Sequence, residues 1–519
     1  MLVNNFLEFT ALRLPNKVAV ICDSEKLTYS EINTTADKLA VALSKQGAKR
    51  QDRIIIFMDS SVETIIALFA ALKAGCIFII VNPDIKAKKL NYIIKDSGAC
   101  TLITQDSKAL VVFEAIKGTD FLKNLIWVSR NKKNDLVRNH TLNDFSTYSW
   151  HEMLSENSLN YPASHCHNID LDIATIIYTS GSTGEPKGVI SAHCNVVAAV
   201  RSITTYLENV EQDIILNTLP LSFDYGLYQV LMAFSFGGTV VLEKRFAFPY
   251  IIVDTIQKQR VTGFPVVPTL IAILLQMKDL SKFDLSSLRY ISNTAAALPV
   301  AHIRKIQSIF PNVKIFSMYG LTECKRVSYL PPEYLINKPE SVGIPIPNEE
   351  VFIVDEKGKE VKANEMGELV VRGANVMCGY WNAPEETAKT FRHGTKLGEI
   401  LLYTGDLFRR DEDGFLYFLG RKDDMIKSKG ERISPKEIEN NICELDSVAE
   451  AAVIGVPDDI LGSAVKAFVV KQIGAQPTEK EIIKFCALKL EPFMVPKYVV
   501  FMKTLPKTPN GKIDKKQLC

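Results

Sequence analysis

Short apolar runs alternate with longer amphipathic segments along the chain up to about residue 350. The runs have strand length, and they lack the polar alternation of a sheet with one solvated face. They therefore predict strands that are buried on both faces of a largely parallel sheet. The segments between them have helical spacing, and this order predicts an α/β fold. The predicted strands are residues 53–58, 76–81, 100–104, 124–129, 175–179, 213–219, 239–243 and 314–319.

Capping signals mark the start of two predicted helices. Ser60 and Glu63 form a capping-box pattern at the start of a helix that we expect to stop at Gly75. Near the C-terminus, residues 434–437 place a serine cap, a proline at the first helical position and an acid in the first turn.

The pattern changes beyond about residue 350, where short strands are broken by Asp-Gly, Lys-Gly and Gly-Arg turns. This predicts a small antiparallel subdomain, followed by a compact α+β tail. We expect residues 1–422 to form a large N-terminal domain of doubly wound sheets together with this subdomain. Residues 423–519 are expected to form a small C-terminal domain.

Composition limits the class of partner. The chain of 519 residues has a formal net charge of +2, so no basic field indicates nucleic acid or an anionic membrane. The longest apolar runs are too short to span a membrane. The 10 cysteines form no C-x-x-C pair, which argues against a zinc site or a disulfide framework. We therefore expect a cytoplasmic protein that acts on small molecules or proteins.

The stretch YTSGSTGEPKGV, residues 178–189, follows a predicted strand. Its glycines allow a backbone to approach a ligand closely, its hydroxyls are donors, and Lys187 adds a positive charge, which is the composition of a phosphate-binding loop. It is not a Walker A loop, because Pro186 stands where that motif needs glycine. Taken alone, the stretch also fits a flexible surface turn.

The same stretch resembles the phosphate-binding signature of the adenylate-forming superfamily, which contains acyl-CoA synthetases, adenylation domains of nonribosomal peptide synthetases, and luciferases. Further motifs of that family follow in order along the chain. They are LTYSEIN (27–33), LKAGCIFIIVNPD (72–84), MYGLTE (318–323), YTGDL (403–407), GRKDDMIKSKGERISPKEIE (420–439) and PKTPNGKID (506–514).

The resemblance implies that a carboxylate and ATP form an acyl-adenylate and pyrophosphate, after which a thiol attacks. Lys512 matches the family lysine that brings these anions together, although it also fits a solvated C-terminal turn. Glu323 and Thr322 match the Mg²⁺ site on the ATP phosphates, and oxygen ligands suit that ion. The alternative for Glu323 is a solvated strand-end turn.

The resemblance also assigns the nucleotide site. Asp406 and Arg421 would bind the ribose, although Arg421 also fits a solvated charge, and Arg432 is a weaker candidate for phosphate contact. Asp423 would be the hinge on which a mobile C-terminal domain rotates. The implied nucleotide-binding residues are Thr179, Ser180, Gly181, Ser182, Thr183, Gly184, Lys187, Tyr319, Gly320, Asp406, Arg421 and Arg432.

Residues 219–234 and their neighbours are expected to bind the acid that is activated. In amino-acid-activating relatives the aspartate of a Phe-Asp pair binds the substrate ammonium, and Asp224 stands there. A buried carboxylate needs a cation, although backbone hydrogen bonds could serve instead. The other implied pocket residues are Tyr225, Tyr228, Ser292, Thr294, Met318 and Arg326.

The stretches FDYGLYQ and YGLTECKRVSYLPPE resemble stand-alone prolyl-adenylating enzymes, so L-proline is the expected substrate. Arg326 departs from the apolar residue usual there, and it would either bind a substrate carboxylate or brace Glu323. No carrier domain follows the last motif, so the expected thiol acceptor is a phosphopantetheinylated carrier protein in trans. The alternatives are an AMP-forming carboxylic acid–CoA ligase and a non-catalytic nucleotide-binding regulator.

Overall fold

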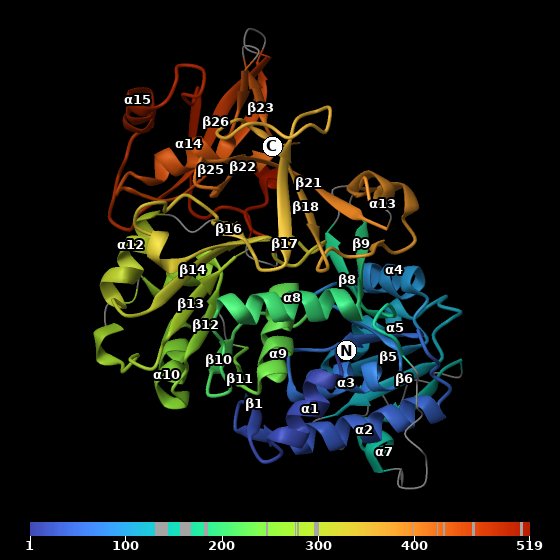
Figure 1. Cartoon of the computed structure of the whole chain (residues 1–519). Coiled ribbons are helices and arrows are strands. Elements are labelled where there is room, and N and C mark those ends of the chain that lie inside the picture. The colour runs from blue at the N-terminus through green and yellow to red at the C-terminus, as the bar shows by residue number, and fades with distance from the viewer. Residues whose placement is uncertain are drawn as a thin grey trace.

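The structure, a computed structural model, contains two large sheets, an antiparallel subdomain and a C-terminal domain (Figure 1). It describes residues 1–129, 144–155, 168–180, 185–244, 248–275, 277, 280–294, 300–396, 398–422, 424–428, 431–458, 462–508 and 512–518.

The first sheet is parallel in its centre and has helices on both faces. Ile54 and Ile56 of β3 face the core shared with the second sheet, whereas Ile55 and Phe57 face the core under α4 (Ala87–Ser97) and α5 (Ala109–Ala115). Burial on both faces explains why its strands are continuous apolar runs. In spatial order the strands are β19 (Gly379–Tyr380), β9 (Pro186–Ala192), β8 (Ile173–Ser180), β4 (Ile77–Ile80), β3 (Arg53–Phe57), β5 (Thr101–Gln105), β6 (Asn124–Val128) and β7 (Ser146–Ser149), with α7 (Trp150–Ser155) after β7.

The second sheet has a parallel centre and antiparallel edges at both ends. Helices α10 (Pro249–Gln259), α11 (Pro268–Leu274) and α12 (Val300–Ile309) follow its strands. In spatial order the strands are β16 (Ile344–Pro345), β15 (Ser328–Leu330), β14 (Lys314–Tyr319), β13 (Tyr290–Asn293), β12 (Gly263–Val266), β10 (Ile214–Asn217), β11 (Thr239–Leu242), β1 (Val18–Cys22) and β2 (Glu25–Thr28).

Four helices pack in the core that the two sheets share: α2 (Tyr29–Lys45), α3 (Val62–Lys73), α8 (His193–Tyr206) and α9 (Asp224–Phe236). Helix α1 (Asn5–Arg13) packs against α9 from the outside. Tyr29 links these layers, because its buried hydroxyl lies 2.5 Å from the carbonyl oxygen of Gly238 and 3.1 Å from that of Ala233. The shared core therefore holds α9, which begins at a predicted site residue, in a fixed position.

The antiparallel subdomain and the C-terminal domain have their own apolar cores. The subdomain contains β17 (Glu349–Val354), β18 (Gly367–Gly373), β20 (Phe391–His393), β21 (Ile400–Arg410), β22 (Leu416–Arg421) and α13 (Pro384–Thr390). The C-terminal domain contains β23 (Ile426–Ser428), β24 (Glu431–Ile433), α14 (Pro435–Cys443), β25 (Val448–Asp458), β26 (Gly462–Lys471), α15 (Glu479–Lys489) and β27 (Tyr498–Met502).

The predicted α/β class is confirmed, with its two sheets, antiparallel subdomain and α+β C-terminal domain. The predicted boundary at residues 422 and 423 falls between β22 and β23 and stays a prediction. The Ser434 cap is confirmed, since its hydroxyl accepts from the N–H of Glu437. The capping box at Ser60 is wrong: Ser61 caps α3 and accepts from the N–H of Thr64.

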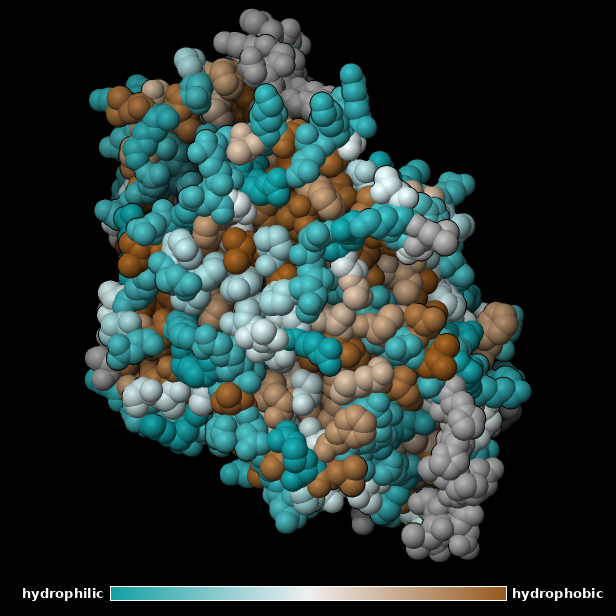
Figure 2. Space-filling model, viewed as in Figure 1, coloured by the Kyte–Doolittle hydropathy of each residue, from teal (hydrophilic) through white to brown (hydrophobic). Residues whose placement is uncertain are grey.

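The part of the chain that the structure describes contains no helix long and apolar enough to cross a membrane. Hydrophilic residues cover much of the face shown in Figure 2, and apolar residues lie between them.

We expect Tyr29→Phe to lower the denaturant midpoint of unfolding. Removing the hydroxyl leaves two carbonyl groups without this donor in the shared core, at a cost of about 1–3 kcal/mol. Urea unfolding followed by circular dichroism measures the midpoint. Tyr250→Phe is the matched control, because Tyr250 is 65% exposed. Equal midpoints for the two variants would contradict the assigned role of Tyr29.

Candidate active site

The turn between β14 and β15 carries several predicted site residues. A β-carbon on Gly320 would lie 2.5 Å from the carbonyl oxygen of Lys325, so only glycine lets the turn close in this way. The N–H of Lys325 donates to the carbonyl of Leu321 at 2.7 Å. Lys325 has φ of +71°, a left-handed conformation that costs about 1–2 kcal/mol for a residue with a β-carbon. The turn thereby fixes Glu323, Lys325 and Arg326.

Glu323 and Lys187 meet around Tyr380, a residue that sequence analysis missed. The Tyr380 hydroxyl donates to Oε1 of Glu323 at 2.7 Å. The ammonium of Lys187 lies 5.8 Å from the centre of the same ring and 3.9 Å from a carboxylate oxygen of Glu386. Burial raises the pKa of Tyr380, so its hydroxyl remains a donor. The pairing of β19 with β9 brings Tyr380 here, and a two-residue strand gives little signal in sequence.

The glycine-rich loop joins β8 to β9, and its described residues lie at the ends of that hairpin. Thr179 faces Lys187 in the strand register, and Ser180 faces Pro186. Thr322 is half-buried beside Glu323. The predicted phosphate-binding residues Gly181, Ser182, Thr183 and Gly184 lie outside the described residues, so their role stays a prediction.

Asp406 of β21 is buried among groups from three segments. Tyr319 donates its hydroxyl to Oδ2 at 2.5 Å, and Nε of Arg421 lies 3.1 Å from Oδ1. Burial raises the pKa of Asp406, whereas the charges of Arg421 and Lys512 act to lower it. Of these two charges, that of Arg421 acts more strongly on Asp406 than that of Lys512, which belongs to the C-terminal domain. Tyr319, Asp406 and Arg421, which belong to β14, β21 and β22, are thus brought into direct contact.

Other predicted nucleotide-binding residues have different surroundings. The ring of Tyr319 packs on Phe408 and Phe418, with ring centres 4.9 and 6.0 Å apart, and Gly320 packs on its own turn. Their contribution to an adenine slot stays a prediction. The side chain of Arg432 and the whole of Asp423 lie outside the described residues, so phosphate contact and the hinge also stay predictions.

Asp224 has a partner that sequence analysis did not foresee. It lies in the first turn of α9, and its Oδ2 is 3.3 Å from the Nζ of Lys325. Lys325 is 3% exposed, and its ammonium lies 3.8 Å from the centre of the Tyr228 ring. Burial lowers the pKa of Lys325 to about 7, with Asp224 acting to raise it and Arg326 to lower it. We expected a substrate ammonium as the cation for Asp224, but the chain itself supplies one.

Arg326 lies beside Tyr225, which is one helical turn before Tyr228 on α9. Its guanidinium carbon is 5.2 Å from the centre of the Tyr225 ring, and the Tyr225 hydroxyl donates to the carbonyl oxygen of Ser292 at 2.7 Å. Glu323 is held by Tyr380 rather than by Arg326, so the bracing alternative has no support among the described contacts. Met318 receives a hydrogen bond from Tyr206, and Thr294 is buried at the end of β13.

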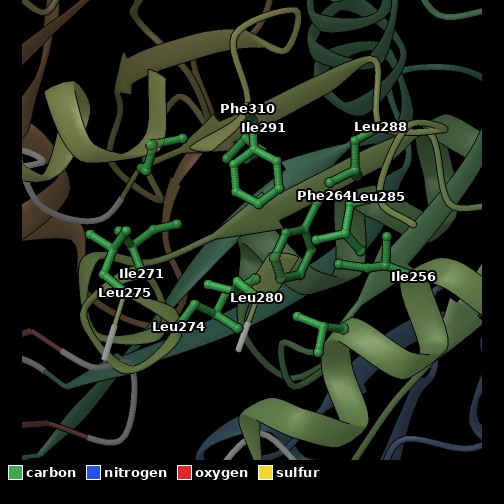
Figure 3. Close-up of a pocket in the computed structure, with 12 residues that line it drawn as sticks. Ile256, Phe264, Ile271, Leu274, Leu275, Leu280, Leu285, Leu288, Ile291 and Phe310 are labelled. Atoms are coloured by element: carbon green, nitrogen blue, oxygen red, sulfur yellow. The ribbon is translucent and has the colours of Figure 1, made fainter. Parts of the chain in front are cut away.

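An apolar cavity lies on the face of the second sheet that is opposite to Tyr225 (Figure 3). Ile291 of β13 lines it, whereas Ser292, the next residue, faces Tyr225. Its volume of about 20 Å³ and its wholly aliphatic and phenylalanine lining leave neither space nor polar contacts for an acid. It is therefore a packing defect and not the substrate site.

The residues around Glu323 fit a magnesium ion that is held mainly by its substrate. Among the described residues, no group of three or more His, Cys, Asp or Glu side chains could hold a metal by itself. Mg²⁺ usually takes one or two protein carboxylates and completes its shell with phosphates and water. Glu323 offers Oε2 for this, because Tyr380 occupies Oε1.

Comparison with known proteins gives matches over nearly the whole chain. Residues 7–381 match the AMP-binding enzyme family, and residues 437–512 match the AMP-binding enzyme C-terminal domain. A long-chain-fatty-acid–CoA ligase of Bacillus subtilis is 33% identical, covering 99% of this chain and 94% of the ligase. Gramicidin S synthase 2 of Brevibacillus brevis is 28% identical over 99% of this chain, which corresponds to 11% of that protein.

Solved structures with the same fold also match. The anthranilate CoA ligase AuaEII in complex with anthranoyl-AMP has a TM-score of 0.88 and 26% identity, covering 100% of this chain and 96% of the ligase. ATP-bound MatB from Rhodopseudomonas palustris has a TM-score of 0.87 and 27% identity, covering 100% and 98% of the two chains.

The hairpin of β8 and β9, Glu323 and Asp406 thus belong to a fold that is shared with enzymes whose solved structures contain ATP or an acyl-adenylate. Because the family match covers most of the chain, this protein belongs to the AMP-binding enzymes of the adenylate-forming superfamily, and it is an AMP-forming ligase.

Proposed function

We propose that this enzyme activates a carboxylic acid without an α-amino group and transfers it to coenzyme A. The observation that carries this proposal is the ion pair between Lys325 and Asp224, at 3.3 Å, which occupies the carboxylate that would otherwise bind an ammonium. The long-chain-fatty-acid–CoA ligase that matches nearly the full length of the chain supports coenzyme A as the acceptor.

In the first step, a carboxylate oxygen of the acid attacks the α-phosphorus of ATP, and pyrophosphate leaves. Two anions must approach each other, so the site has to supply positive charge. Lys512, whose charge acts on Asp406, would act on the carboxylate and the α-phosphate, and Lys187 would act on the other phosphates. Magnesium bound at Glu323 would neutralise further phosphate charge.

Asp406 would orient the nucleotide in the same step. Its carboxylate can accept hydrogen bonds from a vicinal diol, which is how acidic residues of dinucleotide-binding folds hold ribose. Tyr319 and Arg421 hold the two oxygens of Asp406 in place. In the second step the thiolate of coenzyme A attacks the acyl carbon, and AMP leaves.

The Lys325–Asp224 pair argues against the narrower expectation of L-proline and a carrier protein. A substrate ammonium would have to displace Lys325 from Asp224 or lie beside a buried cation, and like charges repel strongly where water is excluded. The similarity to part of gramicidin S synthase 2 keeps amino-acid activation as the second candidate.

Two assays separate these candidates. Exchange of radiolabelled pyrophosphate into ATP should be supported by simple carboxylic acids and not by proline or other α-amino acids. Product analysis should then show an acyl-CoA thioester and no loading of phosphopantetheinylated carrier proteins. Stronger exchange with proline, or loading of a carrier in preference to coenzyme A, would replace the proposal with the second candidate. Absence of exchange with every acid would favour a non-catalytic nucleotide-binding protein.

Lys512→Ala should lower the rate of adenylate formation by about two to three orders of magnitude, because one preorganised group that stabilises transition-state charge is lost. Thioester formation from preformed acyl-adenylate and coenzyme A should be largely retained. Pyrophosphate exchange measures the first half reaction, and chromatography of the thioester measures the second. Lys516→Ala, an exposed lysine of the same segment, is the control. Wild-type exchange in Lys512→Ala would remove the proposed role.

Asp423→Pro tests the proposed hinge. Proline fixes φ, so the substitution should impede a rotation of the C-terminal domain at this residue. We expect thioester formation to fall much more than adenylate formation, measured by the same two assays. Equal losses in both half reactions would argue against the hinge.

Lys325→Ala tests the argument from the ion pair. The substitution frees the Asp224 carboxylate and leaves space for a substrate ammonium, so exchange with small α-amino acids should rise above the wild-type background. The double variant Lys325→Met/Asp224→Asn, which removes both charges, should show no such rise. If both variants remain as inactive with amino acids as the wild type, Asp224 does not bind a substrate ammonium.

A further inference from the structure

Arg326 is a buried cation that no carboxylate of the described residues pairs with. Arg326 is 3% exposed, and its Nε has no hydrogen-bond partner in the described ranges of the chain. Among the residues that the structure describes, none forms an ion pair with it. Arginine does not lose its charge in proteins. Leaving such a charge buried and unpaired is strongly unfavourable, so the site is incomplete without an anion.

The neighbours of Arg326 do not neutralise it. The Tyr225 ring lies 5.2 Å away, and the guanidinium also lies close to the buried hydroxyl of Tyr206. Burial raises the pKa of both tyrosines, so both stay uncharged at neutral pH. Asp224 is paired with Lys325. Tyrosine rings and hydroxyls therefore shape the space around the cation, but they leave its charge in place.

Glu349 is also excluded as the missing anion. Asn375 connects it to this region, since the Asn375 amide donates to a carboxyl oxygen of Glu349 and to the carbonyl oxygen of Arg326. Burial raises the pKa of Glu349 well above its ordinary value, which disfavours its charged form. No ion pair joins Glu349 to Arg326 within the described part of the chain.

Arg289, which immediately precedes β13, is paired with a carboxylate although its side chain is 29% exposed. Arg289 places Nη2 at 2.7 Å and Nε at 3.2 Å from the two carboxylate oxygens of Asp213, and its Nη1 donates to the carbonyl of Leu207. Arg326 has no equivalent of Asp213. The contrast indicates that Arg326 has its partner outside the part of the chain that the structure describes, and that an anionic ligand can fill this place.

We propose that the acid substrate carries a second anionic group, remote from the carboxylate that is activated, and that Arg326 binds this group. The inference rests on the proposed function and names the substrate class: dicarboxylic acids, or acids whose far end carries another anion. A guanidinium binds a carboxylate through two parallel hydrogen bonds, and the free Nε of Arg326 can supply one of them.

Two further groups make the same region suited to such a ligand. The hydroxyl of Tyr228 is buried, has no hydrogen-bond partner among the residues with described positions, and can donate to an anion. Lys325, on the adjacent position of the turn, adds positive charge when protonated. The cations of Lys325 and Arg326 lie over Tyr228 and Tyr225, which are one turn apart on α9, so both face the same side of that helix.

The test compares acids of equal length that differ only at the far end. Pyrophosphate exchange by the purified full-length enzyme is measured with hexanoate against adipate, octanoate against suberate, and benzoate against its carboxylated analogues, with ω-sulfonated acids as a further arm. We expect a preference of about 30-fold or more in kcat/KM for the best dianionic acid over its monoanionic counterpart, because the latter leaves Arg326 unpaired. A preference for the sulfonate over the monoacid supports the same inference.

Arg326→Met should abolish this preference, because it removes the charge while keeping an unbranched side chain at this position. Arg410→Met is the matched control, since Arg410 pairs with Glu360 at the surface, and it should keep the wild-type ratio. Thermal unfolding supplies a readout independent of catalysis. The preferred dianionic acid should raise the melting temperature of the wild type and of Arg410→Met but not that of Arg326→Met.

The outcomes separate this inference from the function on which it rests. The wild type could exchange pyrophosphate as fast with monoacids as with dianionic acids, or faster. That result would overturn the role of Arg326 and leave acid activation intact. A preference for dianionic acids that survives in Arg326→Met would also overturn it. No exchange with any acid would instead refute the proposed function.

Discussion

The close contact of Gly320 with the carbonyl of Lys325 determines the geometry of the acid end of the site. Because no side chain separates these two points, the chain after β14 folds back at once into β15. Lys325 accepts a left-handed backbone conformation to complete the turn. A strained residue that is also buried and charged is unusual, and such strain concentrates at functional sites.

The turn directs its residues to different partners. Glu323 reaches Tyr380 on the edge of the first sheet, near the glycine-rich hairpin, whereas Lys325 and Arg326 reach the tyrosines of α9. The groups expected around the nucleotide phosphates and those expected around the acid therefore belong to one short segment. Helix α9 is in turn held by the core shared between the two sheets, so the opposing wall of the site is also rigid.

Much of the fold could be predicted from sequence because strands buried on both faces must be apolar throughout. Residues 54–57 of β3 and all of β4 follow that rule. Strand β12 was missed because its four residues, Gly263–Val266, include a glycine and a proline, which weaken any strand signal. The site residues Asp406 and Lys512 were predicted only through resemblance, since their proximity depends on how the C-terminal domain packs.

The partner of Asp224 could not have been predicted, and the reason is physical. The need for a cation followed from burial alone, but Lys325 lies about a hundred positions away, and its side chain points inward only because of the turn that Gly320 allows. The same holds for Tyr380, which is carried to Glu323 by the short pairing of β19 with β9. The partners of these side chains are therefore determined by the tertiary structure and not by their spacing in the sequence.

The turn also limits how this pocket can diversify. Two successive residues carry its cations, so a substitution changes one charge at a time, but inserting or deleting a residue would shift both relative to α9 and break the contact at Gly320. Variants that keep the length of the turn between β14 and β15 can therefore change the charges in the pocket while the backbone of the turn stays the same. Variants with a longer or shorter turn would lose this backbone geometry, and the carboxylate of Glu323 would be displaced as well.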